Sequence, residues 1–155
     1  MPYLKKMFVN IKKHLYFYSN HLFTNKKMKR SVFLIITAIL GVLFGGMMLF
    51  FPVFAAENFG ITSTPQLSQM LRSVGGVDLC LGILNLLVYN EPDSKALRAI
   101  LIVNLLSHLI SMIVDGSASF MGAVAFNKIA PGLVAHLFIV IGALVYVMKM
   151  RSPKI

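Results

Sequence analysis

Five ionisable side chains lie within long hydrophobic stretches of this sequence, where a lipid-facing helix would not carry them: Arg72, Asp78, His108, Asp115 and His136. An ionised or strongly polar side chain at the centre of a membrane costs about 2.5–3.5 kcal/mol on insertion scales, so each should face protein or a water-filled cavity. A guanidinium, two carboxyl groups and two imidazoles can bind a polar headgroup or exchange protons, and two histidines can ligate a haem iron. Which of these applies depends on the elements that position them.

The stretch 65–89 is predicted to be a helix with one polar face. At 100° per residue its polar and small residues fall within a sector of about 140°, and these are Ser68, Arg72, Gly75, Asp78, Gly82, Asn85 and Tyr89. Thr64 followed by Pro65 is typical of a helix start, because the hydroxyl caps the first turn and proline needs no backbone donor there. The polar face is therefore expected to look into the protein.

A second polar face lies in the next hydrophobic stretch, 94–115, which Asp93 or Ser94 is expected to cap. Its polar residues are spaced i, i+4, i+7 and i+11, on one side of a helix, and they are Asn104, His108, Ser111 and Asp115. A further stretch, 128–149, has His136 as its strongly polar group before Tyr146. Imidazoles from two helices can therefore meet inside the protein.

The composition is that of an integral membrane protein, with 155 residues, a hydrophobic fraction of 57% and a mean hydropathy of +0.79. The net charge of +10 does not indicate nucleic acid, because eight of the fifteen Lys and Arg residues lie in the first thirty positions, directly before a hydrophobic run. Anionic lipid headgroups explain that placement better. The single cysteine, Cys80, excludes an intrachain disulfide and a CxxC redox or zinc motif.

The predicted fold is an all-α membrane protein: an antiparallel bundle of four transmembrane helices preceded by a basic amphipathic helix. Residues 1–30 form the basic arm, which lies at the cytoplasmic membrane surface or docks an acidic partner. The transmembrane domain covers 31–150, and 151–155 are a cytoplasmic tail. Its four helices are expected at about 31–55, 65–89, 94–115 and 128–149.

Glycines and charges predict how these helices are packed and oriented. Small residues allow close helix approach, and the candidates are Gly41, Gly45, Gly75 and Gly82. Lys and Arg gather at the chain start, in the middle connection and at the chain end, whereas the loops 56–64 and 116–128 contain only Lys128. By the positive-inside rule both termini are cytoplasmic.

Counting residues inward from the outer end of each helix, at about 1.5 Å per residue, predicts a polar pocket in the outer half. Arg72 is expected to be neutralised there by Asp115 or Asp78. The full candidate set for ligand binding is Arg72, Asp78, Asn104, His108, Ser111, Asp115 and His136. The competing interpretation is that such groups only fasten helices, at about 0.6 kcal/mol per hydrogen bond.

Four functions are compatible with this pattern. The first is binding of a small amphiphile or lipid in the outer-half pocket, and the second is service as an accessory or assembly subunit of a larger membrane complex. A b-type haem protein with His108 and His136 as axial ligands is the third. The fourth is a membrane enzyme, but no nucleophile motif, paired catalytic carboxylates or phosphate loop supports one, so no catalytic residue is assigned. No cofactor and no metal site is predicted, and a homo-oligomer is compatible with the small size.

The stretch of about 32–150 contains a set of short motifs and single residues: Phe51-Pro52, Phe59-Gly60-Ile61, Arg72 with Gly75-Gly76, Gly82, Asn85, the run from Glu91 to Arg98, Asn104, His108, Asp115 and His136. In these features the chain resembles small four-helix bacterial inner-membrane proteins of the DoxX-like kind. The resemblance implies a four-helix bundle in the bacterial inner membrane and carries no particular activity.

Overall fold

The computed structural model describes residues 28–150, and this part of the chain is helical, without strands. Its five helices are α2 (Arg30–Phe50), α3 (Pro52–Asn58), α4 (Pro65–Val88), α5 (Lys95–Phe120) and α6 (Phe126–Lys149). The four longer ones, α2, α4, α5 and α6, are each long and apolar enough to cross a membrane. The chain is therefore a multi-pass, all-helical membrane protein. The expected basic arm, up to residue 27, and the tail at 151–155 lie outside the described residues.

The first predicted spanning helix is in fact two helices, because Pro52 interrupts it. Proline has no backbone N–H and its ring clashes with the carbonyl of the preceding turn, so α2 ends at Phe50. Phe51 leaves the helical region, with φ −127° and ψ 54°, and Pro52 then occupies the first position of α3, where a donor is not needed.

The third predicted helix continues past Asp115 and ends only at Phe120. Serines are tolerated there because a hydroxyl can donate to a carbonyl of its own helix, as Ser117 does to Val114 at 2.7 Å. Gly122, with φ +73°, then turns the chain, and α6 begins at Phe126, two residues before the expected 128. The other helix starts are as predicted, since Thr64 and Ser94 each accept a bond from a backbone N–H of the first turn.

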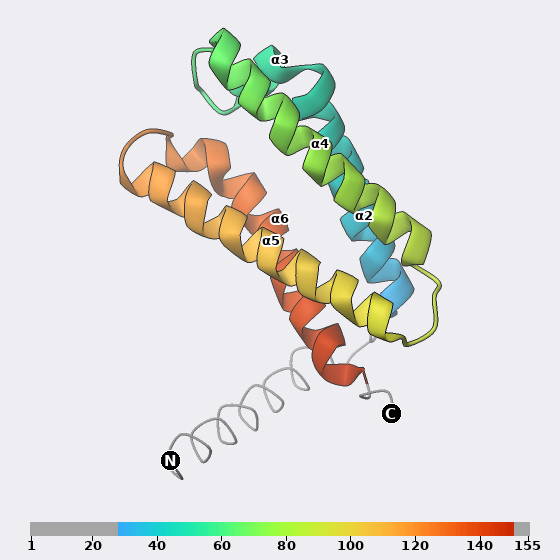
Figure 1. Cartoon of the computed structure of the whole chain (residues 1–155). Helices are drawn as coiled ribbons and strands as arrows, with labels where there is room; N and C mark the ends of the chain where they lie inside the picture. Colours follow the sequence, from blue (N-terminus) through green and yellow to red (C-terminus); the bar gives the residue numbers. More distant parts are fainter. Residues whose placement is uncertain (1–27, 151–155) are drawn as a thin grey trace, which may run out of the picture.

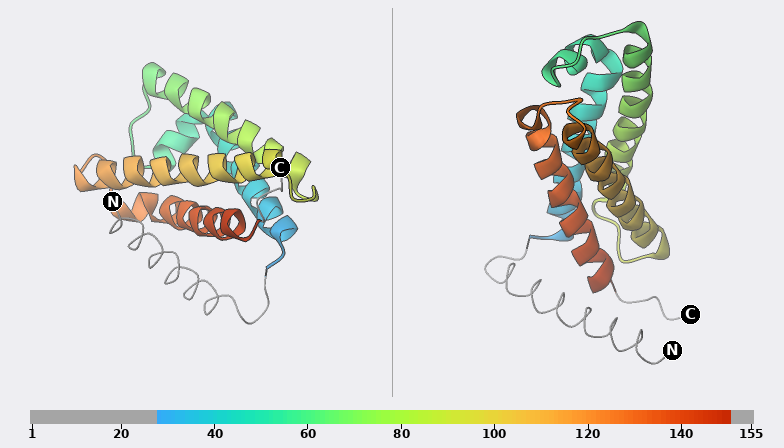
Figure 2. Two further views of the ribbon diagram at one scale, coloured as in Figure 1. Left: turned by 60° about the horizontal axis from the view of Figure 1, so that its bottom comes forward. Right: turned by 90° about the vertical axis from the view of Figure 1, so that its left-hand side faces the viewer.

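The four long helices pack as two pairs, α2 with α4 and α5 with α6 (Figure 1). The pairs touch through α2 and α6 and through α4 and α5. We call the end that holds the start of α2, the connection 89–94 and the end of α6 the closed end. The opposite end, with α3 and the turn 121–125, is the open end. Figures 1 and 2 show the two pairs close together at the closed end and diverging toward the open end.

Glycines bring α2 and α4 into backbone contact. A Cβ added to Gly41 would lie 2.9 Å from the Gly82 Cα, and one added to Gly75 would lie 2.6 Å from the Gly45 carbonyl oxygen. Real Cβ atoms do not approach other atoms so closely, so any side chain at these positions would push the helices apart. The four glycines predicted to pack helices thus lie in the α2–α4 contact.

The buried core joins the two pairs at the closed end. Phe33 of α2 is fully buried and lies against the backbone of Gly142 of α6, where an added Cβ would meet the Phe33 Cδ2 at 2.6 Å. Its ring also contacts Phe138 and Tyr146, with centroids 5.8 Å and 5.2 Å away. The core cluster consists of Phe33, Leu34, Leu97, Leu101, Ile139, Ala143 and Met150.

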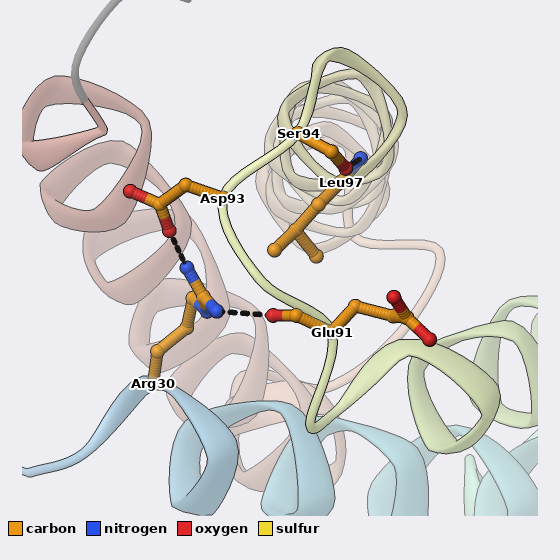
Figure 3. Close-up of polar contacts among 5 residues, drawn as sticks. All are labelled: Arg30, Glu91, Asp93, Ser94 and Leu97. Atoms are coloured by element: carbon orange, nitrogen blue, oxygen red, sulfur yellow. Dashed lines mark hydrogen bonds and ion pairs between the residues drawn. The ribbon is translucent and has the colours of Figure 1, made fainter.

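Polar contacts reinforce the closed end. The Arg30 guanidinium, at the start of α2, forms an ion pair with Asp93 and donates to the Glu91 carbonyl in the connection between α4 and α5 (Figure 3). The Tyr146 hydroxyl of α6 donates to the Met28 carbonyl just before α2. Side chains from both pairs thus hold the chain segments of the closed end together.

Candidate functional site

The polar residues nearest the closed end fasten α4 to α5. The amide nitrogen of Asn85 donates to the Asn104 carbonyl oxygen, and that of Asn104 donates back to Asn85, both at 2.9 Å. Asn104 also donates to the Ile100 carbonyl. Both side chains are sealed, with 1% of each residue exposed. Asn104, expected in a ligand pocket, therefore has its amide engaged within the protein.

Three side chains, those of His108, His136 and Asp115, lie in a row further toward the open end, between α5 and α6. We call this row the histidine chain. His108 Nδ1 and His136 Nδ1 are 2.8 Å apart, a hydrogen bond between the two imidazoles, whose ring centroids are 5.0 Å apart. On its other side His136 faces Asp115, with Nε2 3.6 Å from Oδ2. The His136 and Asp115 side chains remain 21% and 37% exposed. The histidine chain is therefore partly accessible, unlike the asparagine pair.

The direction of the hydrogen bond between the two imidazoles depends on their tautomers. Keeping both rings neutral avoids placing a charge among apolar helices. An ionised Asp115 then favours the tautomer of His136 with its proton on Nε2, facing the carboxylate. With that tautomer the Nδ1 of His136 accepts and the Nδ1 of His108 donates.

Asp78 of α4 belongs to the same region from the other helix pair. It is close enough to Asp115 of α5 for their charges to interact. Among residues 28–150 its carboxyl group has no hydrogen bond or ion pair, and it is not one of the sealed polar groups without a partner. Asp78 is therefore a half-buried carboxyl group without a hydrogen-bond or ion-pair partner among the described residues.

Arg72 lies apart from these groups. Its side chain is exposed, and no hydrogen bond or ion pair within the described chain joins it to Asp78 or Asp115. The reason is angular: at 100° per residue Arg72 and Asp78 lie about 120° apart around α4, and the line of contact with α2 at Gly75 and Gly82 runs between them. The expected neutralisation of Arg72 by an aspartate does not occur in this arrangement.

The remaining predicted residue, Ser111, is half-buried. It lies three residues after His108 and four before Asp115, and so on the same face of α5 as both. A separate shallow depression at the open end contains none of the predicted residues. It is lined by Val53, Glu57, Gly60, Ile61, Thr62 and Ser63.

The two histidines are arranged as hydrogen-bond partners rather than as a metal-bridging pair. Histidine nitrogens on opposite sides of a metal ion stand about 4 Å apart, because each metal–nitrogen bond is about 2.0–2.1 Å. The observed 2.8 Å leaves no space for an iron between the Nδ1 atoms. In the part of the chain that the structure describes, no group of three or more His, Cys, Asp or Glu side chains is placed to hold a metal ion.

Sequence reasoning placed His108 and His136 at one depth but missed two features. One is the pairing of Asn85 with Asn104, although a helix-fastening role for such polar residues was among the interpretations. The other is the closed-end contact of Phe33 with Gly142, for which an aromatic residue and a glycine in apolar helices give no distinctive signal. Comparison with family models, curated proteins and solved structures found no match to this chain.

Proposed function

We propose that this protein binds a small amphiphile of the membrane at its open end. The headgroup lies against Asp115, His136 and His108, and the apolar part remains in the hydrocarbon of the membrane. The observation that carries this proposal is the partial exposure of the Asp115–His136–His108 chain. Polar groups that only fasten helices are expected to be sealed, as Asn85 and Asn104 are.

The same proposal includes an orientation in the bacterial inner membrane with the closed end in the cytoplasm. Basic side chains flank the helix ends there, namely Arg30, Lys95, Arg98 and Lys149. Of the residues described, only Lys128 lies at a helix end on the opposite side. The positive-inside rule then directs both termini inward and the histidine chain toward the outer leaflet. The resemblance to small DoxX-like proteins agrees with this placement.

Native mass spectrometry of the protein, released gently from its own membranes, tests the proposal. The expected result is a non-protein mass of one amphiphile per chain. Asp115→Asn, which keeps the side-chain shape and removes the charge, should lose that mass, and so should His108→Ala. Glu57→Gln is the matched control, because it removes an exposed carboxylate at the open end that is outside the histidine chain.

Three outcomes would contradict amphiphile binding. One is a bare chain, and another is a bound mass that survives both Asp115→Asn and His108→Ala in protein shown by thermal unfolding to be folded. The third is co-release with other polypeptides and no amphiphile, which would favour the role of an accessory subunit of a larger membrane complex. An absorbance spectrum of the same sample tests for haem, which would appear as a Soret band.

A further inference from the structure

We infer that Arg72 binds the phosphate group of an anionic phospholipid, on the face of the α2–α4 pair that points away from α5. The site is separate from the histidine chain, and the inference does not depend on the amphiphile binding proposed above. Arg72 is exposed, and within residues 28–150 its guanidinium has no hydrogen bond or ion pair. A cation in a spanning helix without a protein partner needs a partner from the membrane.

The side of α4 that carries Arg72 follows from the contact of α4 with α2. Asn85 lies three residues after Gly82 and its amide bonds to α5, so that side of the contact line faces α5. Asp78, three residues after Gly75, lies on the same side as Asn85. Arg72 lies three residues before Gly75, about 60° to the other side of the line. Arg72 therefore points away from α5, and Asp78, the only acidic residue of α4, does not share its side.

The depth of Arg72 suits a phosphate group. α4 has 24 residues and is about 36 Å long, so a centred helix projects about 3 Å beyond each side of a hydrocarbon core of about 30 Å. Arg72 lies seven residues after Pro65, about 10 Å along the axis, which places its Cα about 7 Å inside the core. A long arginine side chain lays its stem along the helix and extends the guanidinium back to the headgroups.

The protein surface below Arg72 leaves room for an acyl chain. Gly46 and Gly76 each directly follow a glycine of the α2–α4 contact. Because the two helices are antiparallel, a step of about 100° past the contact turns both positions to the same side, which is the side of Arg72. A Cβ added to either glycine would meet nothing within 4 Å. A chain lying over them would have its phosphate near Arg72, about 6 Å closer to the open end than Gly76.

A phosphate diester complements the guanidinium in charge and in geometry. Two of its oxygens can accept parallel N–H bonds from one arginine. Gln69, one turn nearer the open end on the same side, is also exposed and offers an amide N–H. A zwitterionic headgroup would add a cation beside Arg72, on a side of α4 that has no carboxylate. A headgroup of net negative charge is therefore preferred.

The single cysteine of the chain provides the test. Cys80 is exposed and lies eight residues after Arg72, about 12 Å deeper and about 80° around α4. A fluorophore attached to Cys80 of the full chain in nanodiscs is quenched by lipids with brominated acyl chains that lie beside it. Brominated phosphatidylglycerol and brominated phosphatidylcholine are compared at equal mole fraction and ionic strength. We expect phosphatidylglycerol to associate about fivefold more strongly.

Variants identify the group responsible. Arg72→Gln removes the charge and should reduce the ratio of the two association constants to about one. Lys128→Gln is the matched control and should leave the ratio unchanged, because Lys128 is an exposed cation at the open end of the other helix pair. A second reporter is placed by Ile141→Cys in a Cys80→Ser chain. Ile141 is exposed and lies fifteen residues after the start of α6, as Cys80 does in α4, and a label there should show no preference.

The inference is overturned if the two lipids quench the Cys80 label equally. It is also overturned if the preference survives Arg72→Gln in protein whose thermal unfolding is unchanged. An equal preference at position 141 would overturn it too, because it would show a general attraction of a basic protein for anionic lipid. These measurements do not involve the histidine chain, so their failure leaves the proposed amphiphile binding in place.

Discussion

At the scale of single residues, the sealed amide pair Asn85–Asn104 shows how a polar group is accommodated in an apolar helix pair. Each amide has its partner in the other, at 2.9 Å in both directions, and neither is accessible. Removing one partner leaves the other with unsatisfied hydrogen-bonding groups, which is more costly than removing both.

A double-mutant cycle measures this pair. Asn85→Ala and Asn104→Ala should each lower the free energy of unfolding, and the double variant should lose less than the sum of the two. The expected coupling is about 1 kcal/mol, within the range measured for hydrogen bonds between membrane helices. The free energies come from reversible unfolding in mixed micelles. Additive effects would mean that the amides do not stabilise each other.

Arg72 shows where residue patterns stop being predictive. Periodicity correctly groups Arg72, Gly75, Asp78 and Gly82 in one polar sector of α4. It does not reveal that a second helix lies along the middle of that sector and separates its edges, because the position of α2 depends on backbone contact at glycines. The imidazole pair was within reach of sequence reasoning, since it required only two histidines at equal depth on adjacent helices.

At the scale of elements, the α2–α4 pair depends on which side of each helix carries glycine. Gly45 and Gly75 lie in the interface, whereas a Cβ added to Gly46 or Gly76 would meet nothing within 4 Å. Neighbouring glycines in one helix therefore have opposite structural roles, and each provides a control for the other.

Alanine substitutions at Gly45 and Gly46 should change the free energy of unfolding in opposite directions. Gly45→Ala forces a methyl group against the Gly75 carbonyl, where its Cβ would stand 2.8 Å from the oxygen, and should cost about 1–3 kcal/mol. Gly46→Ala should be neutral or stabilising by up to about 1 kcal/mol, because alanine is the better helix former. Equal effects of both substitutions, measured by the same unfolding assay, would contradict the described interface.

Helix existence was readily predicted from hydropathy, but two helix ends were not. Pro52 lies near the end of a long apolar run, where a proline can kink a helix or end it, and periodicity alone does not distinguish these results. Gly116 and the following serines are typical of a loop in water. In α5 they continue the helix, where Ser117 bonds to its own helix backbone.

At the scale of the whole molecule, the two helix pairs are joined at one end, where Phe33 of one pair is buried against the other. The relative angle of the pairs was beyond sequence reasoning. It depends on an aromatic ring lying on Gly142, distant in the chain, and on the Arg30 contacts with residues of the 89–94 connection.

Loss of the Phe33 ring should loosen this junction. Phe33→Ala is expected to lower the free energy of unfolding by about 3 kcal/mol or more, as for other buried aromatic residues. Phe50→Ala is the matched control on the same helix, because Phe50 is 66% exposed, and it should change stability by less than about 0.5 kcal/mol. Similar losses for both would show that the core is not concentrated at the closed end.

The pairing of the helices also bears on how the chain is synthesised. Each pair consists of consecutive spanning helices, α2 with α4 and α5 with α6, so the first hairpin can be complete in the membrane while the ribosome still holds the second. Docking of the two hairpins through Phe33 and the asparagine amides then comes last. A gene divided within the 89–94 connection would encode two hairpins that each retain their own internal packing, and their reunion would depend on the closed end alone.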